Sequence, residues 1–325
     1  MFSPTRRKTV IAGLLMAGVP GVHAQGVSFS KKPITLVGPF PAGASTDVIA
    51  RLYAAKLSKL LDTPVIVDNK PGASGMLAAG HVARAPADGH TLLVVSNTYL
   101  IAPFVYKNAG YDALTTFTPV TGLFTTPLTL AAKPDFPAKN LAEFVAMAKK
   151  EPGKYSYSTW GVGTSAHLQM ELLKIRAGID VLHVPYKNGP ESSQAVMGGN
   201  VSVGFDTVFS MGARVRAGQL KSLVVFDKKR APVLPEVQTN AEAGFPDIDQ
   251  IGFCGIVAPG KMPKDILDKL AEASRQVVAD PEYASRLSAI GAEALPLVLE
   301  PWGNFLRTET VKVKEVTVKA KISAD

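Results

Sequence analysis

Apolar residues follow two different periods along this chain. Some apolar runs are short, rich in Val, Ile and Leu, and bounded by turn-forming residues, as β-strands are. Other stretches repeat apolar residues every three to four positions, which is the pattern of an amphipathic helix. Because the two kinds alternate along most of the chain, the pattern predicts an α/β fold with largely parallel sheets. The predicted strands are 34–37, 65–67, 91–95, 155–158, 181–184, 203–205, 220–226 and 253–257, and the predicted helices are 48–61, 76–84, 165–176, 190–198, 265–278 and 301–319.

Two of the predicted strand-to-helix turns consist mainly of small residues. The first reads FPAGAST at 40–46, and the second reads TWGVGTS at 159–165. Small side chains leave the backbone N–H groups of a helix start exposed, and such groups bind anions. Ligands of open α/β sheets bind beyond the carboxyl ends of the strands, so the two turns are expected to face each other across a cleft between two domains. We expect one domain to comprise 25–126 and 252–325, and the other to comprise 127–251.

Residues 1–24 differ in pattern from the rest of the chain. A basic segment, RRK at 6–8, precedes a short apolar run at 10–19, and small residues follow before Gln25. This order is typical of a secretory signal peptide, and the run is too short to span a bilayer. We therefore expect removal of 1–24 on export, by the general route or, because of the arginine pair, by the twin-arginine route. No later stretch is apolar over the length needed to cross a membrane, so a soluble exported protein is expected.

Charge and composition narrow the class of partner. Apolar residues make up 46% of the chain, enough for a large core, and the formal charge of +8 is scattered over predicted helix faces, so no nucleic-acid partner is expected. The single cysteine, Cys254, excludes an intrachain disulfide and a cysteine-based metal cluster. Outside the predicted signal, histidines lie at 81, 90, 167 and 183, which is not the spacing of metal ligands, so no metal site is predicted.

No catalytic or cofactor motif is complete. The segment GVGTSA at 161–166 matches a relaxed dinucleotide pattern, but the next predicted strand does not end in the acidic residue that would hold a ribose. The segment GASGM at 72–76 lacks the final glycine of a nucleophile elbow. We therefore expect no cofactor and no catalytic residues.

Three polar residues near the predicted turns each allow two interpretations. Asp47, in a first helical turn, is interpreted as a helix cap rather than a catalytic acid. His167, also in a first turn, is interpreted as a structural residue that orients the preceding loop, with a ligand contact as the alternative. Asp206 follows the predicted strand 203–205, where it either reaches the cleft as a ligand residue or caps the following helix.

Five longer stretches resemble a known family. In chain order they read PITLVGPFPAGASTDVIARLYAAKLS, PVIVDNKPGASGMLAAGHVARAPADGHTLL, YSYSTWGVGTSAHLQMELL, HVPYKNGPESSQAVMGGNVSVGFD and LPEVQTNAEAGFPDID. They are similar to the extracytoplasmic solute-binding receptors of tripartite tricarboxylate transporters, the Bug family, and the resemblance extends from about Lys32 to the C-terminus. It implies a two-domain, periplasmic-binding-protein-like α/β fold of type II, with the ligand cleft between the domains.

The resemblance also implies a function. Receptors of this family capture a small carboxylate between the domains for delivery to integral-membrane transporter subunits. The carboxylate is held largely by backbone groups and waters at two helix-start loops, without an arginine clamp. We expect a monomeric periplasmic receptor that is not an enzyme. The alternatives are a secreted α/β enzyme acting on a carboxylate, with Asp206 or His167 as acid or base, and a ligand sensor for a signalling partner.

Carried over by position, the resemblance implies a set of ligand-binding residues. Two of them depart from the family pattern: Ala44 stands where many members have Gly, and Trp160 stands where smaller residues are common. Trp160 either stacks on an aromatic acid or fills the wall of the cleft, so the identity of the ligand stays open. The implied residues are Phe40, Ala42, Gly43, Ala44 and Ser45 in the first loop, Ser96 and Asn97 after the strand 91–95, Trp160, Gly161, Gly163 and Thr164 in the second loop, and Asp206 at the far end of the ligand.

Overall fold

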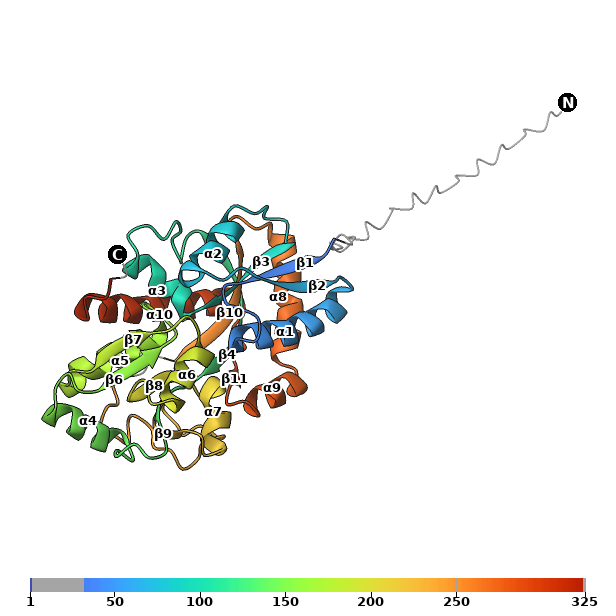
Figure 1. The fold of residues 1–325 in the computed structure, drawn as a ribbon. Coiled ribbons are helices and arrows are strands. Elements are labelled where there is room, and N and C mark those ends of the chain that lie inside the picture. Colours follow the sequence, from blue (N-terminus) through green and yellow to red (C-terminus); the bar gives the residue numbers. More distant parts are fainter. Residues whose placement is uncertain (2–31, 249–250, 324–325) are drawn as a thin grey trace.

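The computed structural model describes residues 1, 32–248 and 251–323, which form an α/β structure with two β-sheets (Figure 1). Every strand and helix predicted from the apolar pattern is present, with ends shifted by a few residues. The predicted signal peptide lies, apart from Met1, outside the described residues.

The first sheet has the strand order β11-β4-β10-β3-β1-β2. β1 pairs in parallel with β2 and β3, whereas β10 runs antiparallel to β3 and β4, and β11 runs antiparallel to β4. The strands are β1 (Ile34–Gly38), β2 (Val65–Asn69), β3 (Thr91–Ser96), β4 (Phe117–Thr126), β10 (Gly252–Pro259) and β11 (Glu293–Ala294).

The second sheet has the strand order β7-β6-β8-β5-β9. β6 pairs in parallel with β7 and β8, whereas β5 runs antiparallel to β8 and β9. The strands are β5 (Leu128–Ala132), β6 (Ser156–Thr159), β7 (Leu182–Pro185), β8 (Val203–Thr207) and β9 (Lys221–Phe226).

The expectation of largely parallel sheets is wrong, because both sheets are mixed. The antiparallel pairs arise mainly where the chain passes from one sheet to the other. β4 ends at Thr126 and β5 begins at Leu128, and the return passes from β9, which ends at Phe226, to β10. β5 and β10 enter their sheets directly from the other sheet and do not follow a strand–helix crossover within their own, and each runs antiparallel to both of its neighbours.

Ten α-helices and one short 3-10 turn accompany the sheets in the described residues. α10 packs against α3 and β4 of the first sheet and also contacts α5 of the second, and Figure 1 shows it in red beside α3. The α-helices are α1 (Ser45–Leu61), α2 (Met76–Ala83), α3 (Asn97–Val105), α4 (Leu141–Lys150), α5 (Ser165–Ala177), α6 (Gly189–Met197), α7 (Val208–Arg216), α8 (Lys264–Val278), α9 (Pro281–Ser288) and α10 (Glu300–Lys319), and the 3-10 turn is Ala73–Gly75.

Several elements were not predicted from the apolar pattern, namely α3, α4, α9, β4, β5 and β11; of these, α4 and α9 are amphipathic helices whose period was overlooked. α3 is buried on almost every side and contains Pro103, so it has no polar face and no helical period. β4 and β5 follow each other with only Pro127 between them, and threonine, glycine and proline interrupt their apolar residues without a regular alternation. Most of their positions are buried on both faces, so the stretch lacks the alternation of a half-buried strand.

We call the part built on the first sheet (32–126 and 252–323) the first lobe, and the part built on the second sheet (127–248) the second lobe. One core lies between the first sheet and α1, α8 and α9, where Tyr53 and Tyr283 are fully buried and Tyr53 Oη lies 2.7 Å from Ser274 Oγ. A second core runs through the second lobe and continues into the first. The predicted domain boundaries at 126/127 and 251/252 stay a prediction.

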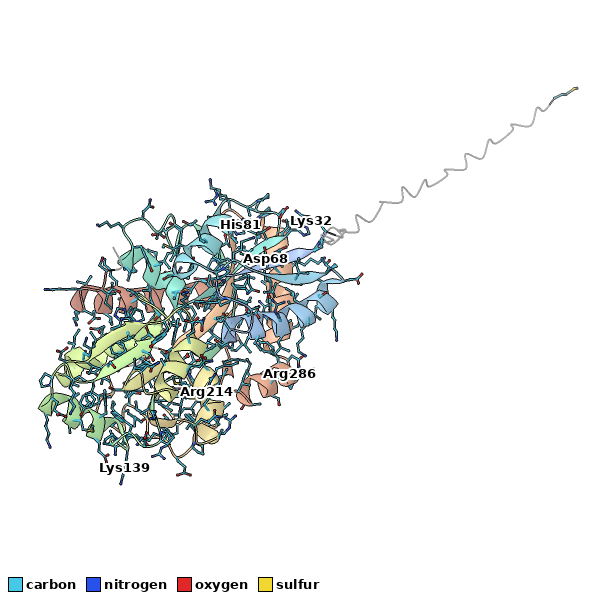
Figure 2. All side chains as sticks on the ribbon, viewed as in Figure 1. Lys32, Asp68, His81, Lys139, Arg214 and Arg286 are labelled. Carbon is cyan, nitrogen blue, oxygen red and sulfur yellow. The ribbon has the colours of Figure 1, made fainter. Side chains whose placement is uncertain are left out.

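Positive charge is distributed over the molecule. Figure 2 shows Lys32 and Lys139 at opposite ends, and both are exposed. Most of the described lysines and arginines that make a hydrogen bond or ion pair do so with a nearby carboxylate, as in Lys264–Asp268 and Lys319–Glu315 on the helix surfaces.

Candidate functional site

A cavity of about 450 Å³ lies between the two lobes, where strand ends meet helix starts from both sheets. Its volume is in the usual range for small-molecule sites. The first lobe contributes Phe40, Pro41, Ala42, Gly43, Ala44, Ser45, Thr46, Ser96, Asn97, Thr98, Phe124 and Phe253, and the second lobe contributes Trp160, Ser165, Lys187, Asn188, Gly189, Pro190, Asp206, Thr207 and Ser210.

The start of α1 forms one wall of this cavity. Its N-cap residue, Ala44, has no side chain that could accept from the helix, and no side-chain cap bond is present. The first N–H groups of any helix lack intrahelical partners. The amides of Ser45 and Thr46 are therefore left for a ligand or for water at the cavity wall. The Gly43 N–H, in contrast, already donates to Asp47 Oδ2 at 2.8 Å.

The start of α3 opens into the same cavity. Its N-cap residue, Ser96, makes no cap bond to the helix, and its hydroxyl instead lies 3.0 Å from the hydroxyl of Thr98. The side chain of Asn97 donates to Ile251 O at 2.9 Å and accepts from Phe253 N at 3.0 Å. Asn97 thus lines the cavity, but its amide holds the returning strand β10 in place.

Three helix starts of the second lobe are capped by their own residues. Thr164 accepts from the third residue of α5, Asn188 from Glu191 N at 2.9 Å, and Thr207 from Ser210 N at 3.1 Å. Each of these caps satisfies the N–H of the third residue of its helix, whereas the N–H groups of the first residues, Ser165 in α5 and Gly189 in α6, are not taken by the cap side chain. The two lobes differ because α1 and α3 on the first lobe have no side-chain cap at all.

The second predicted loop reaches the cavity only in part. Trp160 and Ser165 line it, whereas Gly161, Gly163 and Thr164 are not among the lining residues. The Gly163 N–H donates to His167 Nδ1 at 3.2 Å, and the Thr164 hydroxyl donates to Gly161 O at 2.8 Å. These polar groups already make hydrogen bonds inside the loop. Ligand contacts by Gly161, Gly163 and Thr164 stay a prediction.

Two histidines stack behind this loop. The rings of His167 and His183 lie 4.1 Å apart, and Tyr157 stacks on the other face of His183 at 4.7 Å. Because His167 Nδ1 accepts a hydrogen bond from Gly163, the neutral ring carries its proton on Nε2. Burial lowers the pKa of His167 to about 4 and that of His183 to about 3, so both are neutral at pH 7. His167 does not line the cavity, and it supports the loop from behind.

Asp206 is the penultimate residue of β8, lines the cavity and is 3% exposed. Its Oδ1 accepts from Thr207 N at 2.6 Å, while Oδ2 is buried without a hydrogen-bond partner among the described residues. Burial raises the pKa of Asp206 to about 6, although these hydrogen bonds act against the rise. The N-cap alternative is wrong, because Thr207 is the cap residue of α7. The role of Asp206 in binding a ligand stays a prediction.

Asp47 is buried in the first turn of α1 rather than at its N-cap position. Its carboxylate accepts from Gly43 N and from Arg51 Nε at 3.1 Å, so it fastens the loop to the helix. Burial acts to raise its pKa, but the hydrogen bonds from Arg51, Gly43 and Asn69 outweigh it and lower the pKa below the usual value. Asp47 is not among the lining residues.

Comparison with known proteins identifies the family. Residues 49–319 match the model of the tripartite tricarboxylate transporter family receptor. A UPF0065 protein of Bordetella pertussis (strain Tohama I) is 37% identical over 302 residues, which cover 93% of this chain and 90% of that protein. The chain belongs to this receptor family.

Two solved structures of similar proteins support the same assignment. An R. palustris protein with adipate has a TM-score of 0.84 and 30% identity, covering 89% of this chain and 97% of that one. MatC from Rhodopseudomonas palustris, with bound malate, has a TM-score of 0.80 and 31% identity, covering 87% and 98%. The predicted family and the predicted two-domain, type II periplasmic-binding-protein fold are confirmed.

One segment of the receptor cavity was missed in the sequence. The loop between β7 and α6 contributes Lys187 and Asn188, and the first two residues of α6, Gly189 and Pro190, line the cavity beside them. It is a third strand-to-helix turn, and the rule used for the other two turns could have identified it. Lys187 is exposed at this position, so the cavity of this family member does have a cation beside it.

Other chemistry is not evident in the described residues of this receptor. No group of three His, Cys, Asp or Glu side chains there is placed to hold a metal ion. Cys254 is buried in β10, and burial raises the pKa of its thiol far above the usual value. Within the described residues, no helix combines the length and the hydropathy that a membrane span requires.

Proposed function

We propose that this chain is a periplasmic receptor that binds a small carboxylate in the cavity between the lobes, for delivery to the membrane subunits of a tripartite tricarboxylate-type transporter. The observation that carries the proposal is the pair of uncapped helix starts, α1 and α3, at one cavity wall. A carboxylate taken from water needs donors at the site, and N–H groups at a helix start supply both hydrogen bonds and favourable dipoles.

The related structures support the chemical class. Proteins with the same fold and about a third of the residues identical contain adipate and malate, which are both dicarboxylates. The basic and apolar order of residues 1–24 supports export to the periplasm. Function as a monomer and docking to membrane subunits are part of the same proposal.

The geometry favours binding over catalysis. An acid–base pair made of Asp206 and His167 would need both side chains at the cavity, and His167 does not line it. The family consists of receptors, in agreement with a binding role for this chain. A sensor that signals to a partner would use the same cavity, so the proposal concerns capture of the ligand first.

The test combines ligand screening with one backbone substitution. Ser45→Pro removes the N–H at the first position of α1, where proline is well tolerated, and the extended backbone of Ala44 suits a following proline. Lys264→Pro makes the same change at the first residue of α8, away from the cavity. Calorimetry with adipate, malate and a set of monocarboxylates should detect binding to the wild type. Ser45→Pro should weaken it by roughly tenfold or more, because a hydrogen bond to a charged group is lost.

The control decides how a loss is interpreted. Lys264→Pro should bind like the wild type, and both variants should melt cooperatively. If no carboxylate raises the melting temperature of the wild type, the proposed function is wrong. If a carboxylate binds and Ser45→Pro binds it as tightly as the wild type, the anion site has been placed on the wrong helix start.

A further inference from the structure

Two aromatic residues line the cavity from opposite lobes. Phe40 belongs to the loop between β1 and α1, and Trp160 belongs to the loop between β6 and α5. Both are partly exposed, and neither stacks on another ring of the described residues. Other rings of the chain pack in groups, as Phe136 does with Phe144 and Tyr155. Phe40 and Trp160 are therefore two cavity rings without a ring partner.

The floor of the cavity continues this aromatic lining. Phe124 of β4 and Phe253 of β10 line it and are 1% and 3% exposed. The four rings come from four separate segments, so the aromatic character of the cavity is not the result of one apolar stretch. The face of an aromatic ring carries partial negative charge, which disfavours a carboxylate and favours the positive edge of another ring.

The anion donors lie beside these rings. Phe40 lies in the loop that leads into α1, whose first residues, Ser45 and Thr46, have free amides. Because these amides and the rings of Phe40 and Trp160 belong to residues that line one cavity, a carboxylate bound at the amides leaves the rest of the ligand in the space that the aromatic residues line. Taking the carboxylate site of the proposed function as given, we infer that the cavity takes a carboxylate attached to an aromatic ring, with that ring packed between Phe40 and Trp160.

The sharpest test compares two ligands of the same charge and ring size. Benzoate has an aromatic ring, whereas cyclohexanecarboxylate has a saturated one and offers similar apolar area. An aromatic pair contributes beyond its buried area, so benzoate should bind roughly threefold to tenfold more tightly for each ring contact. Calorimetry on the full-length mature protein measures both ligands, with adipate and malate included as aliphatic dicarboxylates.

Tryptophan fluorescence locates the ligand independently. The chain has two tryptophans, and Trp302 is fully buried, with its indole N–H donating to Ile256 O at 3.1 Å. Trp302 does not line the cavity. Benzoate should therefore change the emission of Trp160, and Trp160→Leu should abolish that change.

Matched variants separate ring contacts from general packing. Phe40→Leu and Trp160→Leu should each reduce the preference for benzoate over cyclohexanecarboxylate, while Phe136→Leu changes a partly buried ring outside the cavity and should leave the preference intact. If Trp160→Leu does not fold, Phe40→Leu and the wild-type fluorescence still decide. Equal binding of benzoate and cyclohexanecarboxylate, or binding of adipate and malate without benzoate, overturns the inference and leaves the proposed function standing. Absence of binding by every carboxylate overturns both.

Discussion

Gly163 offers a quantitative test of how closely the two lobes approach. It has φ +68°, and a Cβ built on it would lie 3.0 Å from Cγ1 of Val105, on α3 of the other lobe. Gly178, at the end of α5, has a similar φ of +64°, but nothing lies within 4 Å of its Cβ position. Gly163→Ala and Gly178→Ala therefore share the backbone strain and differ in the contact between lobes.

The expected magnitudes follow from these two terms. An alanine in the left-handed region destabilises the folded state by about 1–2 kcal/mol. Replacing glycine by alanine also lowers the conformational entropy of the unfolded chain, which offsets about 0.4–1 kcal/mol of that cost. Gly178→Ala should therefore lower the free energy of unfolding by about 1 kcal/mol. Gly163→Ala should lower it by about 2–3 kcal/mol, because overpacking against Val105 adds at least about 1 kcal/mol.

Urea denaturation of the two variants and the wild type measures this difference. In a Val105→Ala background the 3.0 Å contact is removed and only Cβ remains, at 3.5 Å, which is ordinary van der Waals contact. Gly163→Ala should then cost no more than Gly178→Ala. The reasoning is refuted if the two glycine variants are equally stable in the wild-type background. It is refuted equally if Val105→Ala fails to relieve the additional cost.

Two further predictions concern buried polar side chains at the cavity and behind it. Asn97→Ala should lower the free energy of unfolding by about 2–4 kcal/mol, since Ile251 O and Phe253 N each lose a buried partner; a thermal melt that matches the wild type would contradict this role. Two buried groups should give stability profiles of opposite slope in pH. The pKa of Asp206 is raised to about 6 against about 3.9 in the unfolded chain, so the wild type should lose roughly 2–3 kcal/mol relative to Asp206→Asn as pH rises from about 4 to above 6. The pKa of His167 is lowered to about 4, so the wild type should lose stability relative to His167→Gln as pH falls from about 6.5 to about 4. Denaturant titrations between pH 4 and pH 8 measure both, and flat difference profiles would show that the two groups are not buried as described.

The elements with a local signal could be predicted from the sequence. An amphipathic helix such as α8 and a strand bounded by turn residues such as β1 carry their period within a few residues. The small-residue turns at 40–46 and 159–165 were visible for the same reason, and both contribute to the cavity. The family resemblance could also be recognised, because it rests on long stretches of sequence in a fixed order.

The tertiary structure decided which polar groups near the cavity remain free to bind a ligand. The sequence shows small residues at both helix starts, but the Gly43 N–H is taken by Asp47 and the Gly163 N–H by His167. Asn97 follows β3, as the sequence predicted, but its side-chain oxygen accepts a hydrogen bond from Phe253 N of β10, which lies far along the chain. Lys187 reaches the cavity only because β7 lies beside β6 in the second sheet. A backbone amide is available to a ligand only if no side chain has bonded to it first. The side chains that bond to Gly43 and Gly163 are four residues away and the one that bonds to Phe253 is 156 residues away, and the residue pattern alone does not show which of these bonds the folded chain forms.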